Sequence, residues 1–321
     1  MPTDVITRMD SRGTGKYEQL LARCKAMTAI PTAVAHPCDD ASLGGVVEAA
    51  RAGIIAPILV GPAERIRAVA KALALDIAAY EIVDAPHSHG AAARAVELVR
   101  QGRADLLMKG SLHTDELMGE VVRRETGLRT DRRVSHAFVM DVPTYHKPLL
   151  ITDAAVNIFP TLDDKRDIVQ NAIDFMHALG VEAPKVAILS AVETVTLKIP
   201  STIDAAALCK MADRGQIVDA ILDGPLAFDN AISAEAARTK GIVSAVAGDP
   251  DIVLVPDLEA GNMLAKNLTF LSRADAAGVV LGARVPIILT SRADNQRTRL
   301  ASCAVAALYA AARRRAGVIA A

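Results

Sequence analysis

The sequence of 321 residues lacks tryptophan altogether, and its aromatic content is only 3%. Hydrophobic residues nevertheless make up 51% of the chain, so the core must be built from aliphatic side chains. Cores of Ala, Val, Ile and Leu are typical of parallel strands that helices cover on both faces. The composition therefore favours an α/β protein, and the length favours two domains.

The chain also lacks an excess of charge of either sign, because 36 Lys and Arg stand against 37 Asp and Glu. Nucleic acid is therefore not an expected partner, and any anion must be recognised by local cations. No apolar run has membrane-spanning length and no signal peptide is evident, so no membrane partner is expected. The four cysteines form no C-x-x-C pair, which favours reduced thiols in a cytoplasmic protein.

Several catalytic motifs are absent as well. There is no G-x-G-x-x-G, which argues against a standard dinucleotide-binding fold. No G-x-S-x-G surrounds Ser291, which argues against an acyl-accepting nucleophile there. His87-x-His89 has no further ligands at a usable spacing, and the run from His36 to Asp40 is equally incomplete. We therefore predict no metal site.

Short apolar runs alternate with helical patterns along the chain. The predicted strands are 54–60, 80–83, 104–108, 134–141, 149–153, 186–190, 217–222, 252–255, 279–281 and 287–289. The predicted helices are 42–52, 64–75, 91–100, 115–124, 163–179, 204–214, 235–240, 263–273 and 298–315. This rhythm makes parallel strands with right-handed crossovers the default. Residues 1–16 are predicted to be a mobile lead-in.

The stretch 286–295 combines a strand, a polar turn and a helix start. Ser291 and Arg292 follow the apolar run, and Asp294 and Asn295 are both good N-cap residues. Ligands bind at the carboxyl ends of strands in open α/β sheets, and helix starts favour anions. Arg292 adds a planar donor fork that suits phosphate. A capped helix with a solvated arginine remains the alternative.

Other predicted strand ends are equally polar. The strand that ends at Met108 leads into Lys109, Gly110 and His113, where the lysine or the imidazole could meet a phosphate. The second half contains three polar strand ends, of which the turn with Ser291, Arg292 and Asp294 is one. The other two are Asp223-Gly224-Pro225 with Asp229-Asn230, and Asp257 with Glu259, Gly261 and Asn262. Each loop alone could be ordinary turn chemistry. We expect the three to converge, because all follow strands of one sheet.

With these motifs the chain resembles the phosphate acetyl/butyryl transferase family over nearly its whole length, and the butyryl-type branch more than the acetyl-type branch. The resemblance lies in His36–Asp40, Ala52–Gly61, Met108–Gly110, Asp223–Ser233, Val255–Asn262 and Leu289–Asp294. It implies two α/β domains with mainly parallel sheets and a cleft between them, like isocitrate and isopropylmalate dehydrogenases. Residues 17–148 with 283–321 would form the first domain, and residues 149–282 the second.

The family transfers acyl groups between coenzyme A and phosphate, so the resemblance implies these as substrates, with no bound cofactor and a homodimer or larger assembly. It assigns catalysis to Ser291 and Arg292. The aspartate of the acetyl branch would fall on Thr298, so Asp294 is our own candidate for the third catalytic residue. Two further site arginines of that branch fall on Met118 and Phe270. The substrate-binding candidates are Lys109, Gly110, His113, Asp223, Gly224, Pro225, Asp229, Asn230, Glu259, Gly261 and Asn262.

Two alternatives remain open from the sequence. The first is a decarboxylating dehydrogenase that uses NAD(P) and a divalent metal bound by Asp223, Asp229 and Asp257. The second is a non-catalytic acyl-CoA-binding paralogue, in which the missing arginines reflect lost chemistry.

Overall fold

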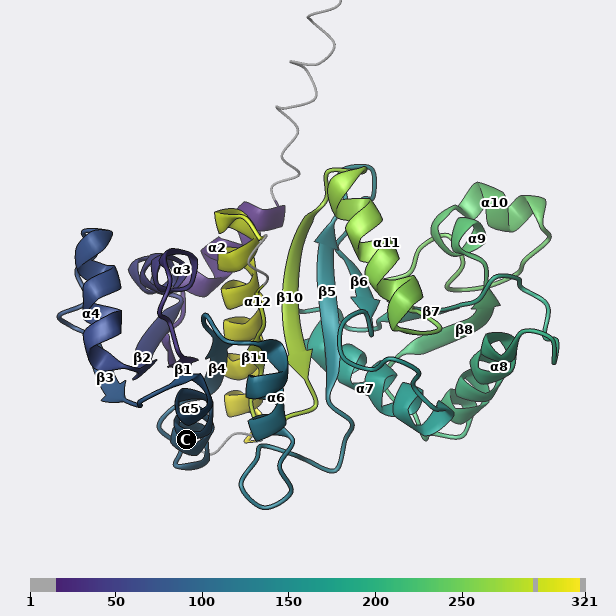
Figure 1. The fold of residues 1–321 in the computed structure, drawn as a ribbon. Helices are drawn as coiled ribbons and strands as arrows, with labels where there is room; N and C mark the ends of the chain where they lie inside the picture. The colour runs from purple at the N-terminus through teal and green to yellow at the C-terminus, as the bar shows by residue number, and fades with distance from the viewer. Residues whose placement is uncertain (1–15, 291–293, 318–321) are drawn as a thin grey trace, which may run out of the picture.

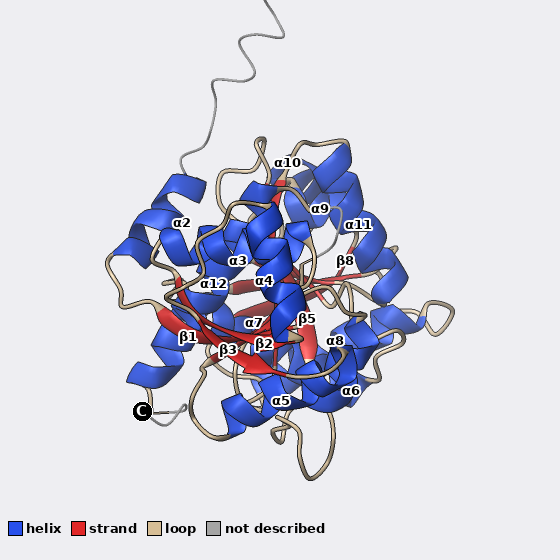
Figure 2. Ribbon diagram, turned by 60° about the vertical axis from the view of Figure 1, so that its left-hand side comes forward, coloured by secondary structure: helices blue, strands red, loops and turns tan. Residues whose placement is uncertain are grey.

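The computed structural model describes residues 16–290 and 294–317. Within them, eleven strands form one sheet in the order β3-β2-β1-β4-β11-β10-β5-β6-β9-β7-β8, with helices on both faces (Figures 1 and 2). The strands are β1 Ile30–Ala35, β2 Ile55–Gly61, β3 Glu81–Asp84, β4 Leu106–Lys109, β5 Ser135–Asp141, β6 Leu149–Thr152, β7 Lys185–Leu189, β8 Ile221–Leu226, β9 Ile252–Leu254, β10 Asp275–Leu281 and β11 Ile287–Ile288. The helices are α2 Lys16–Lys25, α3 Asp40–Arg51, α4 Ala63–Ala72, α5 Ser88–Arg100, α6 Thr114–Val121, α7 Leu162–Ala178, α8 Pro200–Asp213, α9 Phe228–Ile232, α10 Ala234–Thr239, α11 Leu258–Phe270 and α12 Gln296–Arg315.

The sheet is largely parallel but reverses direction in its middle. β10 is antiparallel to β11 and to β5, and β5 is antiparallel to β6. The pairings on either side of this group are parallel. As a result β11 runs opposite to β8 and β9. The carboxyl end of β11 therefore points to the edge of the sheet opposite to that of β8 and β9. The shared sheet alone does not bring the polar loops together, contrary to the expectation from the sequence.

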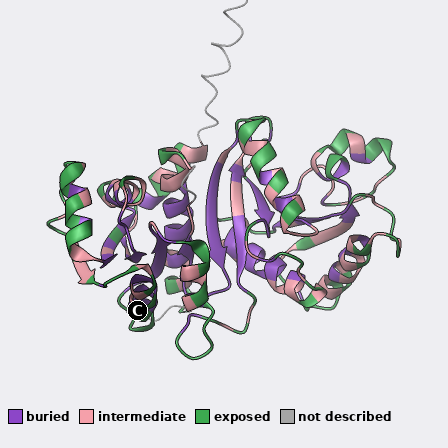
Figure 3. Ribbon diagram, viewed as in Figure 1, coloured by how far each residue is buried: buried purple, intermediate pink, exposed green. Residues whose placement is uncertain are grey.

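The apolar core differs between the two faces of the sheet. On the back face, defined by α2, α3, α7, α8 and α12, one cluster runs under all of these helices. On the front face, defined by α5, α6, α9, α10 and α11, there are two separate clusters, one under α5 and α6 and one under α9 to α11. The long strands β5 and β10 lie between them, and the strands are mostly buried (Figure 3). No helix in residues 16–290 or 294–317 has both the length and the apolar character needed to cross a bilayer.

The predicted strands and helices are present, with shifts at their ends, and three further elements appear. Strand β1 was not among the predicted strands. Helix α9 is short, and helix α2 begins at Lys16, which was assigned to the lead-in. The Nζ atom of Lys16 lies 2.8 Å from Oδ1 of Asp141, so this residue is fixed to the sheet. Residues 1–15 lie outside the described part of the chain.

Candidate active site

The carboxyl ends of β1 and β4 are locked together around Gly110. Its amide donates to the carbonyl of Ala35 at 2.8 Å, and the amide of Ser111 donates to the carbonyl of His36 at 2.8 Å. A Cβ atom on Gly110 would lie 2.4 Å from the Ala35 oxygen and 2.5 Å from the His36 oxygen, so only glycine fits. Ser111 Oγ donates to the His36 carbonyl at 2.9 Å and accepts from the Cys38 amide at 3.1 Å. The predicted loop is thus a rigid support.

Lys109 ends β4 on the front face. Leu107 belongs to the front cluster and Met108 to the back cluster, so the alternation of a strand places Lys109 at the front. The residue is only 9% exposed, and its Nζ atom lies 3.4 Å from the carbonyl oxygen of Gly110. An ammonium group held in a largely dry position attracts anions more strongly than one in water. Lys109 is therefore well placed for the phosphate contact predicted from sequence.

The predicted catalytic turn begins beside this lysine. β11 is parallel to β4, with Ile288 opposite Met108. Ser291 and Arg292 lie outside the described residues. Their described neighbours Thr290 and Asp294 are both half-buried.

The start of α12 is fixed against α3. Asn295 is the N-cap residue, and its side chain accepts from the amide of Thr298 at 2.8 Å. The side chain of Gln296 donates to Glu48 at 2.5 Å. The sequence offered Asp294 and Asn295 as equal candidates for the cap, and the structure assigns that role to Asn295. Asp294 therefore need not serve as the cap.

Thiol chemistry is disfavoured next to this support. Cys38 is buried beside Ser111, and burial raises the pKa of its thiol to about 11. A thiol with so high a pKa is hardly ionised at neutral pH and is a poor nucleophile.

His113 and Met118 lie on or next to α6. His113 occupies the N-cap position without a side-chain hydrogen bond to the helix, and it is exposed. Met118 is half-buried against the cluster under α5 and α6. Phe270 lies at the far end of α11 and is 76% exposed. The two positions to which the resemblance assigned site arginines are thus on different helices, and neither carries a charge here.

A turn that begins at Asp153 faces α11. Its carboxylate is 3% exposed and accepts four hydrogen bonds. Oδ1 accepts from the amides of Ala155 and Val156, both at 2.9 Å. Oδ2 accepts from the amide of His136 at 3.1 Å and from the side chain of Asn157 at 2.6 Å. Four donors around one buried carboxylate fix the turn.

The Asp153 turn connects the two front clusters. Asn262 on α11 donates from its side chain to the carbonyl of Ala154 at 3.2 Å. A Cβ atom on Gly261 would lie 2.9 Å from the carbonyl oxygen of Asp153, so α11 needs glycine there to pack this closely. Val156 packs against the cluster under α5 and α6. The predicted residues Gly261 and Asn262 therefore contact the Asp153 turn, which itself packs against the cluster under α5 and α6.

The N-terminus of α11 is already occupied by acidic groups. Asp257 is its N-cap and accepts from the amide of Ala260 at 2.9 Å, and Glu259 lies in the first turn. The helix begins at Leu258, five residues earlier than predicted, so Glu259, Gly261 and Asn262 are helical rather than in a loop. Two carboxylates here repel a phosphate. Of the predicted residues, Lys109 therefore offers the more suitable surroundings for an anion.

His136 lies on the front face between the two clusters. Burial lowers its pKa to about 4, against the opposing effect of the Asp153 carboxylate, so the imidazole is neutral at pH 7. The ring stacks edge-on against Phe138, with 4.3 Å between centroids, and lies close to Gly278. Within the described residues its Nδ1 atom has no hydrogen-bond partner. The front face of β5, between the two clusters, thus carries a neutral, polar side chain.

The Asp223-Gly224-Pro225 segment lies inside β8 rather than after it. Asp223 accepts from the amide of Gly224 at 2.8 Å. A Cβ atom on Gly224 would lie 2.8 Å from Ile188, so β7 and β8 pack closely here. The strand was predicted to end at Leu222 because Gly and Pro usually interrupt strands.

Asp229 and Asn230 follow β8 on helix α9. Asp229 pairs with Lys240, with 3.0 Å between Oδ2 and Nζ, and that pair lowers its pKa. Asn230 is fully buried, and its amide lies 3.4 Å from a carboxylate oxygen of Glu193. Six strands of the sheet separate β4, which carries Lys109, from β8, which precedes this pair, so the structure does not bring all the predicted residues together.

The aspartates of the metal-dependent alternative also do not form a cluster. Asp257 caps α11 and Asp229 pairs with Lys240, as described above. Among the described residues, no group of three or more His, Cys, Asp or Glu is arranged to hold a metal ion.

Asp153, His136 and Ser111 were not among the predicted site residues. Asp153 had one signal in the sequence, a carboxylate directly after the apolar run of β6. His136 had none, because a histidine inside an apolar strand is more often a core residue. Ser111 lies in the Lys109 loop but was not singled out.

These features define an α/β protein in which a buried lysine lies at the carboxyl end of β4. The family model described as Phosphate acetyl/butaryl transferase matches residues 87–307, and the chain belongs to this family.

Known relatives agree with this assignment. A phosphate acetyltransferase from Rhizobium meliloti is 69% identical over 95% of this chain and 96% of its own. A phosphate butyryltransferase from Clostridium beijerinckii is 43% identical over 92% of this chain and 98% of its own. The crystal structure of a branched-chain phosphotransacylase from Enterococcus faecalis V583 superimposes with a TM-score of 0.76 at 30% identity, covering 88% of this chain and 99% of that one. The expected closeness to the butyryl branch is not favoured, since the acetyltransferase is the more similar of the two.

Proposed function

We propose that this protein transfers an acyl group between coenzyme A and phosphate, in the reaction acyl-CoA + phosphate ⇌ acyl phosphate + CoA. The observation that carries this conclusion is the 69% identity to a phosphate acetyltransferase over 95% of the chain. The same identity supports acetyl as the preferred acyl group. The substrates are small molecules, and no bound cofactor takes part.

We place the substrates on the front face, in a cleft between two domains. The first domain would be residues 17–148 with 283–321, and the second would be residues 149–282. Two separate apolar clusters on the front face support this division, although the sheet continues from one half to the other. Lys109 and the turn from Ser291 to Asp294 would form one wall. The Asp153 turn, with Gly261 and Asn262, would form the opposite wall.

The chemistry is direct transfer within a ternary complex. In the direction of acyl-CoA synthesis, the thiol sulfur of CoA forms a bond to the acyl carbon, and the bond from that carbon to the phosphate oxygen breaks. The phosphate leaves with the electron pair. A thiol with a pKa of about 8.5 is mostly protonated at neutral pH, so a base is needed to take its proton. Asp294 is our candidate, and such a base contributes about 10²–10⁴-fold.

The remaining roles follow from charge. Arg292 would hold the phosphate, with charge-assisted hydrogen bonds worth about 1.5–3 kcal/mol each. Ser291 would donate to the developing oxyanion. Lys109 and Gly110 would present a second cation and a rigid backbone to the phosphate, and His113 would lie at the entrance. Glu259 would lie at the edge of the part of the cleft that takes CoA, whereas Asp223, Gly224, Pro225, Asp229 and Asn230, which lie in β8 and α9, receive no role.

The activity is tested by measuring release of the CoA thiol from acetyl-, propionyl- and butyryl-CoA, with and without phosphate. We expect release that depends on phosphate and is fastest with acetyl-CoA. Arg292→Ala should lose most turnover while the melting temperature stays unchanged, and Arg315→Ala, on an exposed residue of α12, is the matched control. A nearly active Arg292→Ala enzyme would contradict the role of this arginine.

Direct transfer is tested separately by isotope exchange. An acyl-enzyme intermediate would allow labelled phosphate to exchange into acetyl phosphate when CoA is absent. Transfer within a ternary complex requires CoA, so we expect no exchange without it and rapid exchange when it is added.

We further propose a cytoplasmic homodimer or larger homo-oligomer, as the family resemblance implies. Light scattering on the purified protein would give its mass in solution, and a monomer would refute this part of the proposal.

A further inference from the structure

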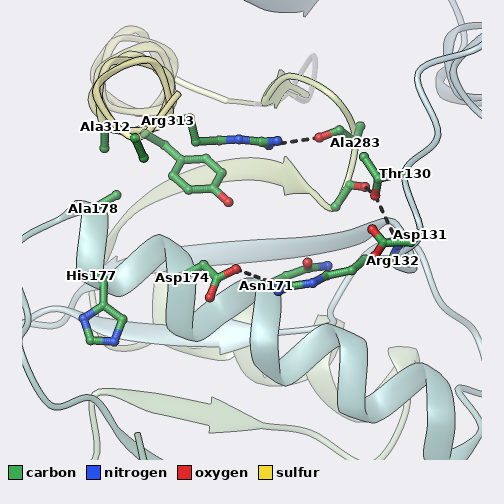
Figure 4. A pocket seen from close by; sticks show the side chains of 13 residues that line it. Thr130, Asp131, Arg132, Asn171, Asp174, His177, Ala178, Ala283, Ala312 and Arg313 are labelled. Carbon is green, nitrogen blue, oxygen red and sulfur yellow. Dashed lines mark hydrogen bonds and ion pairs between the residues drawn. The ribbon is translucent and has the colours of Figure 1, made fainter. Parts of the chain in front are cut away.

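A large pocket lies on the back face, away from Lys109. It has a volume of about 590 Å³ and lies between α7, α12 and the segment that precedes β5 (Figure 4). Both helices pack on the back cluster, whereas the candidate active site is on the front face. The residues used below are Thr130, Arg132, Asp174, Gly282, Tyr309 and Arg313.

One cation of the pocket is balanced by a carboxylate. Nη1 of Arg132 lies 2.6 Å from Oδ2 of Asp174, and the side chain of Gln170 donates to Oδ1 of the same carboxylate at 3.0 Å. Both oxygens of Asp174 are therefore engaged by the protein. Asp131 is exposed at the rim, where water and salt screen its charge.

Arg313 is the unbalanced cation. Its Nη1 atom donates to the carbonyl of Ala283 at 3.0 Å, and its guanidinium carbon lies 5.5 Å from the centre of the Tyr309 ring. In residues 16–290 and 294–317, no carboxylate lies within ion-pair distance of Arg313. Figure 4 shows Arg313 on the α12 side of the pocket and Arg132 on the opposite side. The guanidinium is thus held in place by neutral groups.

The pocket is built from small residues and a tight turn. Ala178, Ala312 and Ala316 line it. Gly282 has φ +81, and a Cβ atom on it would lie 2.3 Å from the carbonyl oxygen of Arg133, so this position cannot carry a side chain. Thr130 closes the turn by donating to the carbonyl of Gly282 at 2.6 Å. The space is therefore a property of the fold and too large for an inorganic anion alone.

We propose that this pocket binds a small organic anion, whose carboxylate or phosphate group pairs with Arg313 and whose carbon skeleton lies against the alanines. A planar guanidinium fork matches both kinds of anion. An isolated cation is a less suitable ligand, because Asp174 is already bound on both oxygens. The proposal is independent of the acyl transfer proposed above.

The test is calorimetric titration of the full-length protein with three probes: succinate, citrate and glycerol 3-phosphate. At least one should bind, and comparison of the carboxylates with the phosphate ester identifies the preferred group. Arg313→Gln should weaken that binding by about tenfold to a hundredfold, since a charge-assisted pair is lost. Arg315→Gln is the matched control, because Arg315 is exposed on the same helix and does not line the pocket.

A second variant removes space rather than charge. Ala312→Leu should fill the pocket and abolish binding while α12 stays intact, which circular dichroism would verify. No binding of any probe at millimolar concentration would overturn the proposal, as would unchanged affinity in Arg313→Gln. Neither result depends on the acyl-transfer assay, so failure of this proposal is distinguishable from failure of the proposed function.

Discussion

Replacing Gly110 by alanine should damage both stability and turnover. The new Cβ atom would lie 2.4–2.6 Å from three backbone atoms of Ala35 and His36, and backbone atoms cannot rotate away. The ends of β1 and β4 must therefore separate, which disrupts the two 2.8 Å hydrogen bonds that Gly110 and Ser111 donate. Each such bond contributes about 0.5–1.5 kcal/mol, and overpacking costs about 1–3 kcal/mol more. We expect a loss of about 2–6 kcal/mol in the free energy of unfolding.

The same displacement should move Lys109, and a misplacement of about 1 Å can cost about a hundredfold in rate. Denaturant unfolding and phosphate-dependent CoA release measure the two effects. Gly119→Ala is the matched control, because a Cβ atom there meets nothing within 4 Å on helix α6. It should stabilise the protein by up to about 1 kcal/mol. A Gly110→Ala enzyme with wild-type stability and turnover would refute the reasoning.

Three further predictions concern single side chains. Lys109→Met should raise KM for phosphate about tenfold or more without lowering the melting temperature, whereas Lys71→Met, on exposed α4, should leave steady-state kinetics unchanged. Asp153→Ala should lower the free energy of unfolding by about 3 kcal/mol or more, since four donors lose their acceptor; urea unfolding that matches the wild type would show that the turn is held by other means. Burial acts to raise the pKa of Asp249, but hydrogen bonds from Lys185 and Lys147 outweigh it and lower the pKa to about 2. The stabilising contribution of Asp249 is therefore complete above about pH 4 and is lost as the pH falls towards 2. Asp249→Asn should be less stable than the wild type at pH 7 and should lose less stability on acidification. Unfolding curves at pH 7 and at about pH 2 measure this difference.

The sequence predicted the α/β class and most elements because strand length and helical periodicity are local properties. It predicted Lys109 and Gly110 because a polar loop after a buried run is also visible locally. It did not reveal the reversal of β10 and β5, since apolar runs carry no mark of their direction in a sheet. Strand β1 was not predicted, and it contains Pro31, a residue that is uncommon inside central strands.

Other parts of the site depend on contacts between distant residues. The Asp153 turn requires donors from His136 and Asn157, and nothing in the sequence links these three positions. The neutral state of His136 follows from burial between two clusters, which only the packed structure establishes. The pocket at Arg313 is formed by α7 and α12, which are more than a hundred residues apart in the sequence.

Phosphorus NMR of the purified enzyme with acetyl-CoA and phosphate tests the central claim most directly. We predict that a resonance of acetyl phosphate appears, that free CoA increases in equal amount, and that treatment with a chelator makes no difference. CoA release without acetyl phosphate, or no reaction despite measurable binding of acetyl-CoA, would contradict the assignment as a phosphate acyltransferase.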